Sequence, residues 1–95
     1  MSELIHLPNI GKVLEQHLIA VGIETAKQLQ EIGAQEAFVR IRLYTDPTAC
    51  IRVLYSLQGA ILGIPDTQLS DETKTALKQF FRNLPDTLSR SSDKK

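Results

Sequence analysis

The sequence has one cysteine, no apolar run long enough to cross a bilayer, and no excess of charge of either sign. The single thiol of Cys50 cannot form an internal disulfide, and it gives no support to zinc ligation by cysteine. A membrane-spanning helix needs roughly 18 consecutive apolar residues. The opening Met1-Ser2-Glu3 does not have the basic and then apolar pattern of a secretory signal. These absences predict a protein of the reducing cytoplasm that does not enter a membrane.

The charge balance and the histidines limit the classes of function. Eleven basic and eleven acidic residues cancel, which argues against a strong electrostatic binder of nucleic acid but leaves room for a local basic patch. His6 and His17 are eleven residues apart and have no acidic or thiol partner at ligand spacing. We therefore expect no metal site and no cofactor. Without clustered acids or a Cys–His pair at useful spacing, we also expect no enzyme.

The 95 residues are enough for one domain, and 42% of them are apolar. The apolar residues recur at helical spacing, and no segment shows the alternation of a β-strand. The sequence predicts an all-α fold, a compact domain of five helices over residues 1–84. Residues 85–95 are polar and are predicted to form a flexible tail.

Capping residues and glycines place the helix boundaries. Thr25 and Gln28 have the spacing of a capping box. Asp46, followed by Pro47, has the pattern of an N-cap, and Ser70 has the same pattern before two acidic residues. We predict helices over about residues 11–21, 26–32, 34–44, 47–62 and 71–84.

Helical spacing also predicts which side chains face the core. It places Val13 on the buried stripe of the first helix and Tyr44 on that of the third. Cys50, between Ala49 and Ile51, is expected to be a small core residue. Ala76 is assigned to the apolar side of the fifth helix.

The stretch Leu7–Lys12 predicts a tight hairpin turn that opens the first helix. Unpaired N–H groups and the positive end of the helix dipole can hold a phosphate at such a terminus. The candidates for contact with a DNA backbone are Asn9, Ile10, Gly11 and Lys12. Glu15, one turn into the helix, would repel a phosphate. The alternative is a packing turn that sets the angle between helices.

A second basic area could form from Arg40, Arg42 and Arg52, joined by Lys78 and Arg82. The alternative is a solvated face on which Arg40 pairs with Glu36, four residues earlier in the same helix. Exposed pairs of this kind are common and contribute little to stability.

The predicted fourth helix is apolar on nearly all sides, which is typical of a central core helix or of a subunit interface. Gly59 within it costs about 1 kcal/mol relative to Ala, so we expect another backbone to approach it closely, from the same chain or from a second copy. An exposed apolar patch on this helix could pair subunits into a homodimer. The candidate packing and interface residues are Tyr55, Gly59, Leu62, Gly63 and Ile64.

Several fragments, in order, resemble one family over about residues 4–84. The fragments are Leu7-Pro8-Asn9-Ile10-Gly11, Gly22-Ile23-Glu24-Thr25, Gly33-Ala34, Phe38, Arg40, and Leu54 to Gly63. Together they resemble the C-terminal domain of the TfoX/Sxy competence regulators. The resemblance implies a small all-α domain with a helix-hairpin-helix-like start.

Full-length members of that family regulate DNA uptake and transcription and carry a further N-terminal domain, so this chain is expected to be a stand-alone version of the C-terminal domain. It departs from the family pattern at Ile64-Pro65, where relatives often have a Trp. It also has Asn9-Ile10-Gly11 in place of the Gly-hydrophobic-Gly of the helix-hairpin-helix motif. The resemblance and the residues together predict a non-enzymatic regulatory or adaptor module. Its partner is either the DNA backbone at the turn or a protein at the central helix.

Overall fold

The computed structural model describes residues 3–84, and these form helices and their connections without a strand. The elements in order are η1 (Glu3–His6), α1 (Lys12–Ala20), α2 (Ala26–Ile32), α3 (Ala34–Tyr44), α4 (Ile51–Leu62), η2 (Asp66–Gln68) and α5 (Asp71–Arg82). The all-α prediction with five α-helices is confirmed for this part of the chain. The predicted tail over residues 85–95 lies outside the described residues.

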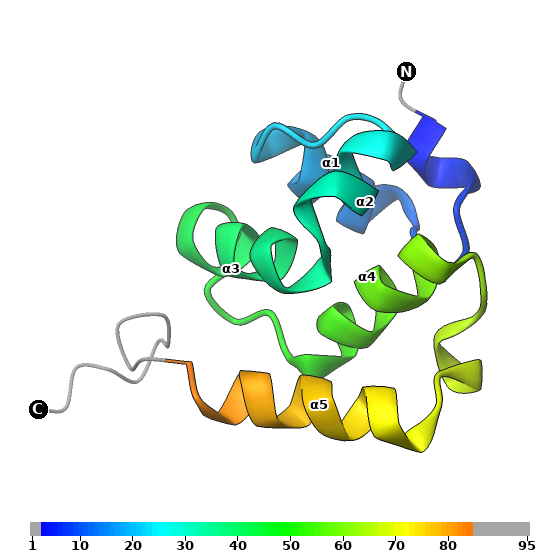
Figure 1. The fold of residues 1–95 in the computed structure, drawn as a ribbon. Coiled ribbons are helices and arrows are strands. Elements are labelled where there is room, and N and C mark those ends of the chain that lie inside the picture. Colours follow the sequence, from blue (N-terminus) through cyan, green and yellow to red (C-terminus); the bar gives the residue numbers. More distant parts are fainter. Residues whose placement is uncertain (1–2, 85–95) are drawn as a thin grey trace, which may run out of the picture.

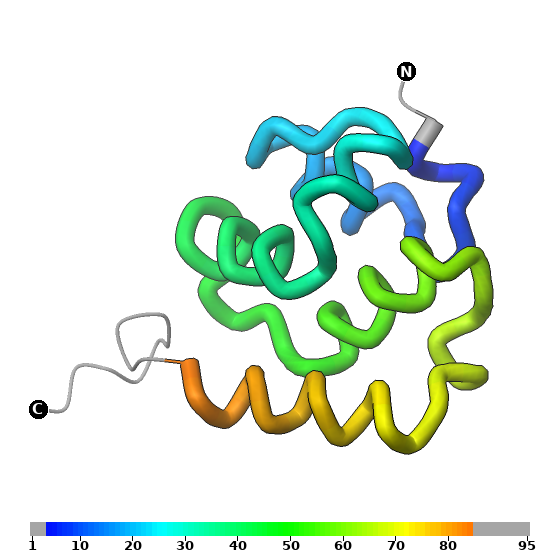
Figure 2. Tube along the Cα trace, viewed as in Figure 1, coloured from blue at the N-terminus to red at the C-terminus, as the bar shows by residue number. Residues whose placement is uncertain are grey.

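Helix α4 lies at the centre of the molecule. It contacts α2, α3, η2 and α5, and α5 runs along its lower side, away from α1 and α2 (Figures 1 and 2). Leu54 and Leu57 of α4 are fully buried, together with Leu18 of α1, Leu29 of α2 and Phe38 of α3. The prediction that the fourth helix is a central core helix is therefore confirmed.

Two of the predicted N-caps are present. The Gln28 N–H donates to Thr25 Oγ1 at 3.0 Å, and Gln28 Oε1 accepts from the Thr25 N–H at 3.2 Å, which completes the capping box of α2. At the start of α5, Ser70 Oγ accepts from the Thr73 N–H at 3.1 Å. Both caps use partners three residues away, so the local sequence was sufficient to predict them.

The prediction that Asp46 caps the fourth helix is wrong. The Asp46 carboxylate accepts from the N–H of Thr48 at 3.1 Å and from its hydroxyl at 2.6 Å, which closes a short turn. Helix α4 begins only at Ile51, with Cys50 as its N-cap. An Asp before a Pro favours a turn as readily as a helix start, because its carboxylate can accept from an N–H two residues ahead.

Four side chains predicted to be buried are exposed. Val13 is 69% exposed, Tyr44 is 75% exposed, and Cys50 and Ala76 are also exposed. Val13 lies in the first turn of α1, Tyr44 is the last residue of α3, and Cys50 precedes α4. Spacing identifies a face of a helix, but it does not show where along the helix a neighbour stops covering that face.

One side chain joins the two halves of the sequence. Asn9 has a φ of 70°, and its Nδ2 donates to the backbone oxygen of Ile64 at 3.0 Å and of Ser56 at 3.5 Å. Its Oδ1 accepts from the Asp66 N–H at 3.1 Å. The turn before α1 is thereby fixed to the end of α4 and to the connection that follows it.

Gly59 makes room for this junction. A Cβ atom at position 59 would lie 2.5 Å from Asn9 Nδ2, 2.8 Å from the Ile64 oxygen and 3.3 Å from the Asp66 Cα. The predicted close approach of another backbone is therefore confirmed, and the approaching segment belongs to the same chain. It is the connection that follows α4.

Substituting Gly59→Ala should destabilise the fold, although Ala favours a helix by about 1 kcal/mol. The added methyl group overlaps the Asn9 amide and the Ile64 carbonyl, and overpacking of this kind costs about 1–3 kcal/mol. Urea denaturation measures the loss. In the matched control Gly11→Ala, the new Cβ meets nothing within 4 Å, so a loss below about 1 kcal/mol is expected. Equal losses in the two variants would contradict this explanation.

Substituting Asn9→Gly separates the backbone role of this residue from its side-chain role. Gly accepts positive φ without strain, so the loss reports the missing side-chain hydrogen bonds, at about 1–3 kcal/mol. Asn9→Asp should be at least as destabilising, because it replaces the donor to Ile64 with a carboxylate oxygen. Thermal and urea unfolding of both variants check this. Unchanged stability in Asn9→Gly would show that the junction contributes nothing.

Candidate functional site

The turn before α1 presents an uncapped helix N-terminus. Gly11 is the N-cap, with no side-chain cap bond, and its oxygen accepts the first helical hydrogen bond from the Glu15 N–H at 2.9 Å. The N–H groups of Lys12, Val13 and Leu14 precede that bond, so none of them has a partner in the helix ladder. Gly11, Lys12 and Val13 are exposed. The arrangement can receive an acceptor group from outside.

The four residues predicted to contact a DNA backbone differ in their accessibility. The side-chain amide of Asn9 is hydrogen-bonded to the backbone of Ile64 and Asp66. Ile10 is 5% exposed and belongs to the core. Gly11 and Lys12 are the two that a phosphate can approach. The turn therefore also packs the helices together, which was the alternative to phosphate binding in the interpretation of the sequence.

The three arginines predicted to form a second basic area are not equivalent. Arg40 Nε donates to Glu36 Oε2 at 3.1 Å, so the alternative prediction of a helix pair is confirmed. Arg42 donates to the backbone oxygen of Ala49 at 3.0 Å, and its guanidinium carbon lies 5.5 Å and 5.2 Å from the ring centroids of Phe38 and Phe81. This cation–π stacking, between rings that are themselves 5.8 Å apart, gives Arg42 a packing role. Arg52 is exposed.

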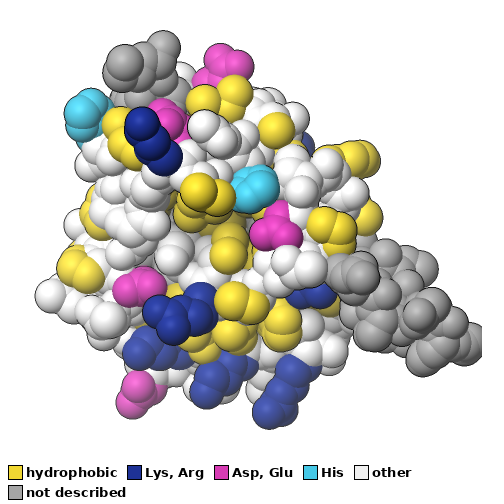
Figure 3. All heavy atoms as spheres, turned by 180° about the vertical axis from the view of Figure 1, so that it is seen from behind, with side chains coloured by type: hydrophobic (Ala, Val, Ile, Leu, Met, Phe, Trp, Pro, Cys, Tyr) yellow, Lys and Arg dark blue, Asp and Glu magenta, His cyan; other side chains and the backbone are white. Residues whose placement is uncertain are grey.

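A groove of about 280 Å³ lies between α1, the end of α3 and α4. Val13 and Leu14 line one side, and Arg52 and Val53 line the other. One face of the molecule shows apolar side chains beside a histidine and an acidic group (Figure 3). The groove is not among the sites that the sequence predicts. The feature of the sequence that could have indicated the groove is the apolar Val13, which directly follows Lys12.

The polar rim of this groove is formed by His17 and Asp46. Hydrogen bonding by the Thr48 hydroxyl lowers the pKa of the Asp46 carboxyl, and burial opposes this effect in part. The Thr48 N–H and the charges of His17 and Arg42 lower the pKa further by smaller amounts. Asp46, like any Asp with an ordinary or lowered pKa, is ionised at neutral pH and gives this end of the groove a negative charge.

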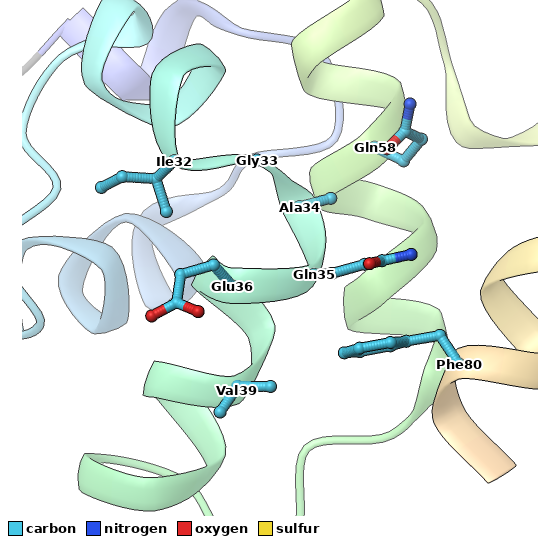
Figure 4. A pocket seen from close by; sticks show the side chains of 8 residues that line it. All are labelled: Ile32, Gly33, Ala34, Gln35, Glu36, Val39, Gln58 and Phe80. Carbon is cyan, nitrogen blue, oxygen red and sulfur yellow. The ribbon is translucent and has the colours of Figure 1, made fainter. Parts of the chain in front are cut away.

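A second hollow, of about 450 Å³, is bordered by the junction of α2 and α3, by α4 and by α5 (Figure 4). In this view Gln35 extends from α3 toward α4 and Phe80 extends from α5 toward α3, whereas Gln58 lies on α4 above them. Ile32 and Val39 add apolar surface. Glu36, the acidic group of this hollow, is paired with Arg40. The lining has no pair of groups suited to acid–base or nucleophilic chemistry.

The residues predicted to form an apolar interface patch are buried to different extents. Leu62 is 53% exposed, whereas Tyr55 and Ile64 are partly buried against the core, so Leu62 is the most accessible of the three apolar candidates. The Tyr55 hydroxyl is buried and has no hydrogen-bond partner among the described residues. Gly63 ends α4 with a φ of 78° and a ψ of 26°, the left-handed conformation of a helix C-cap.

Two searches of the described residues gave negative results. Within residues 3–84 no three His, Cys, Asp or Glu side chains are grouped closely enough to hold a metal ion. Over the same residues no helix has the length and apolar character that crossing a membrane requires.

Comparison with known proteins agrees with the fold and the motifs. The model of the TfoX C-terminal domain matches residues 1–81. Protein Sxy of Escherichia coli (strain K12) is 31% identical over 78 residues, which cover 82% of this chain and 37% of Sxy. The chain thus spans little more than a third of the length of that relative.

Two crystal structures from Listeria monocytogenes have the same fold. One, of an uncharacterized protein in a triclinic form, is 47% identical with a TM-score of 0.81 and covers 83% of this chain and 89% of its own. The other, a tetragonal form of a protein of unknown function, is 46% identical with a TM-score of 0.83 and covers 87% of this chain and 100% of its own. Through its sequence motifs, its helical fold and these matches, the chain belongs to the family of TfoX C-terminal domains.

Proposed function

We propose that this chain is a non-catalytic regulatory module, related to the competence regulators, that binds the DNA backbone at the N-terminus of α1. It acts in the cytoplasm and needs no cofactor. The observation that carries the proposal is the uncapped start of α1, where Gly11 and Lys12 are exposed on a turn that Asn9 holds in place. Membership of the TfoX C-terminal family and the similarity to Sxy support the regulatory role.

The chemistry of the turn fits one phosphate group. The N–H groups of the first helical turn and the positive end of the helix dipole attract an anion, and the Lys12 ammonium adds a full charge. Glu15 lies in the same first turn and opposes the anion. Because these charges nearly balance, the contact is weak. The turn is therefore better suited to positioning DNA than to supplying most of the binding affinity.

The variant Lys12→Glu tests this contact. It reverses the charge at the site, so the affinity for a fluorescently labelled duplex at low salt should fall by roughly tenfold or more. Fluorescence anisotropy measures the change. The matched control is Lys27→Glu, an identical reversal at an exposed position in α2, which should bind nearly as the wild type does. Equal losses in the two variants, or no binding by the wild type at low salt, would contradict DNA contact at the turn.

A second candidate is association with a protein, either a regulatory partner or a second copy of this chain. The observation that favours it is the 53% exposure of Leu62 at the end of α4, beside the C-cap Gly63. Isolated exposed leucines are common on protein surfaces, so this candidate rests on less than the first.

Leu62→Asp tests the homodimer form of this second candidate. If Leu62 is at the centre of a dimer interface, sedimentation equilibrium should find a concentration-dependent dimer for the wild type and a monomer for the variant, because a buried carboxylate without a partner is costly. Leu43→Asp, at a position that is 47% exposed in α3, is the matched control and should leave the dimer intact. A wild type that stays monomeric at high concentration would remove the homodimer.

A further inference from the structure

Helix α5 carries a row of basic side chains. Lys74, Lys78 and Arg82 follow one another at intervals of four residues and therefore share one side of the helix. Leu77 is buried beside this row, and Phe81 is packed against the core. Lys78 and Arg82 are exposed and Lys74 is partly exposed, and none of the three forms an ion pair within residues 3–84. The row is free to meet a negatively charged ligand.

Neighbouring helices extend the positive charge. Arg52 of α4 is exposed, and the Arg42 guanidinium from α3 lies 5.2 Å from the ring centroid of Phe81, the residue that precedes Arg82. Lys and Arg side chains gather along the lower edge of one face, where α5 runs (Figure 3). We call the set Arg52, Lys74, Lys78 and Arg82 the basic face.

Few acidic groups oppose the basic face. Asp71 lies at the N-terminal end of α5, three residues before Lys74. Glu72 precedes Lys74 by two residues, which places it about 200° away around the helix. Asp46 lines the same groove as Arg52, and Glu15, Glu24, Glu31 and Glu36 lie in or between α1, α2 and α3. A neutral chain can therefore have a positive face.

We propose that the basic face binds the phosphate backbone of duplex DNA. Cations four residues apart on a helix are spaced by about 6 Å, so the three on α5 extend over about 12 Å. One strand of DNA carries a phosphate every 3.4 Å or so along the axis, and the row can thus follow one strand over three to four phosphates. Successive cations on α5 are therefore about two phosphates apart along the strand.

The chemistry of the face favours a nucleic acid backbone above an acidic protein. The outward positions between the cations are polar, with Thr75 and Gln79 exposed, whereas protein interfaces generally have an apolar or aromatic centre. Duplex DNA fits better than a single strand, because no aromatic side chain lies among the cations of the basic face and Phe80 and Phe81 of α5 are packed against the core.

This inference goes beyond the proposed function, because it assigns DNA binding to a different surface. The basic face supplies the affinity for DNA that the turn lacks. It shares with that proposal only the ligand. Arg52 lines the groove that Asn9 and Val13 also line, so the start of α1 and the basic face border the same side of the molecule. One duplex can therefore be held by the basic face and positioned by the turn.

The test is the double variant Lys78→Gln/Arg82→Gln in the full chain, titrated against a labelled duplex by fluorescence anisotropy at several salt concentrations. Each phosphate contact contributes about −0.9 to the slope of log affinity against log salt. Four cations predict a wild-type slope of about −3.6, or roughly a 100-fold loss of affinity from 50 to 200 mM salt. The double variant should reduce the magnitude of that slope by about two, because two contacts are removed.

Matched variants separate this inference from the proposal for the turn. Lys27→Gln removes an exposed charge from α2 and should change neither affinity nor slope, while Lys12→Gln reports on the turn alone. Loss in the double variant with no change in Lys12→Gln would support the basic face and overturn the contact at the turn. Loss in Lys12→Gln alone would overturn the basic face. Gln is a good helix former, so an unchanged circular dichroism spectrum verifies the fold of each variant.

A competition experiment distinguishes the class of ligand. Poly-glutamate, added to the complex with labelled duplex, should displace the DNA only at a large excess of carboxylate over phosphate. Binding of poly-glutamate by a wild type that does not bind the duplex at low salt would overturn the proposal and indicate an acidic protein. Equal slopes for the wild type and the double variant would also overturn it.

Discussion

The fold depends on a close approach between Asn9 and Gly59. The Asn9 amide reaches the backbone of Ile64 and Asp66 at 3.0 and 3.1 Å, and only a residue without a Cβ at position 59 leaves space for it. The backbone at Asn9, with a φ of 70°, is itself restricted to residues that tolerate the left-handed region, chiefly Gly, Asn and Asp. Asn meets both needs, because it tolerates this conformation and provides a donor and an acceptor on one short side chain. The beginning of the chain and the connection after α4 are consequently fixed to each other.

This constraint also limits what the turn can bind. The residue that fixes the turn has no side-chain group left for a ligand, and Ile10 is part of the core. Backbone N–H groups and Lys12 remain, with Glu15 in the same helical turn. A surface that binds a polyanion needs more positive charge than Lys12 alone provides. Helix α5 carries that positive charge in the row of basic side chains that ends with Arg82. In this account one part of the domain positions the ligand and another part attracts it.

The sequence was a good guide where the deciding contacts are local. The capping box at Thr25 depends on a partner three residues away, and the apolar residues on nearly all sides of α4 indicated a central helix. Gly59 was recognised from its cost within a helix, but Asn9, whose amide comes nearest to it, is fifty residues distant and no local pattern identifies that contact. Asp46 was misassigned because turns and helix starts use the same carboxylate contact. Val13 and Tyr44 were misassigned because spacing does not reveal where a neighbouring helix ends.

The most direct test of the central claim is hydrogen exchange at the Asp66 amide, whose N–H donates to Asn9 Oδ1 at 3.1 Å. If the junction holds the fold together, this amide in the wild type should exchange as slowly as the amides of α4. In the Asn9→Gly variant, the Asp66 amide should lose its protection while the Leu57 amide of α4 keeps more of its own. NMR-detected exchange of the two amides measures this. An Asp66 amide that exchanges in the wild type as fast as an open loop would contradict the account.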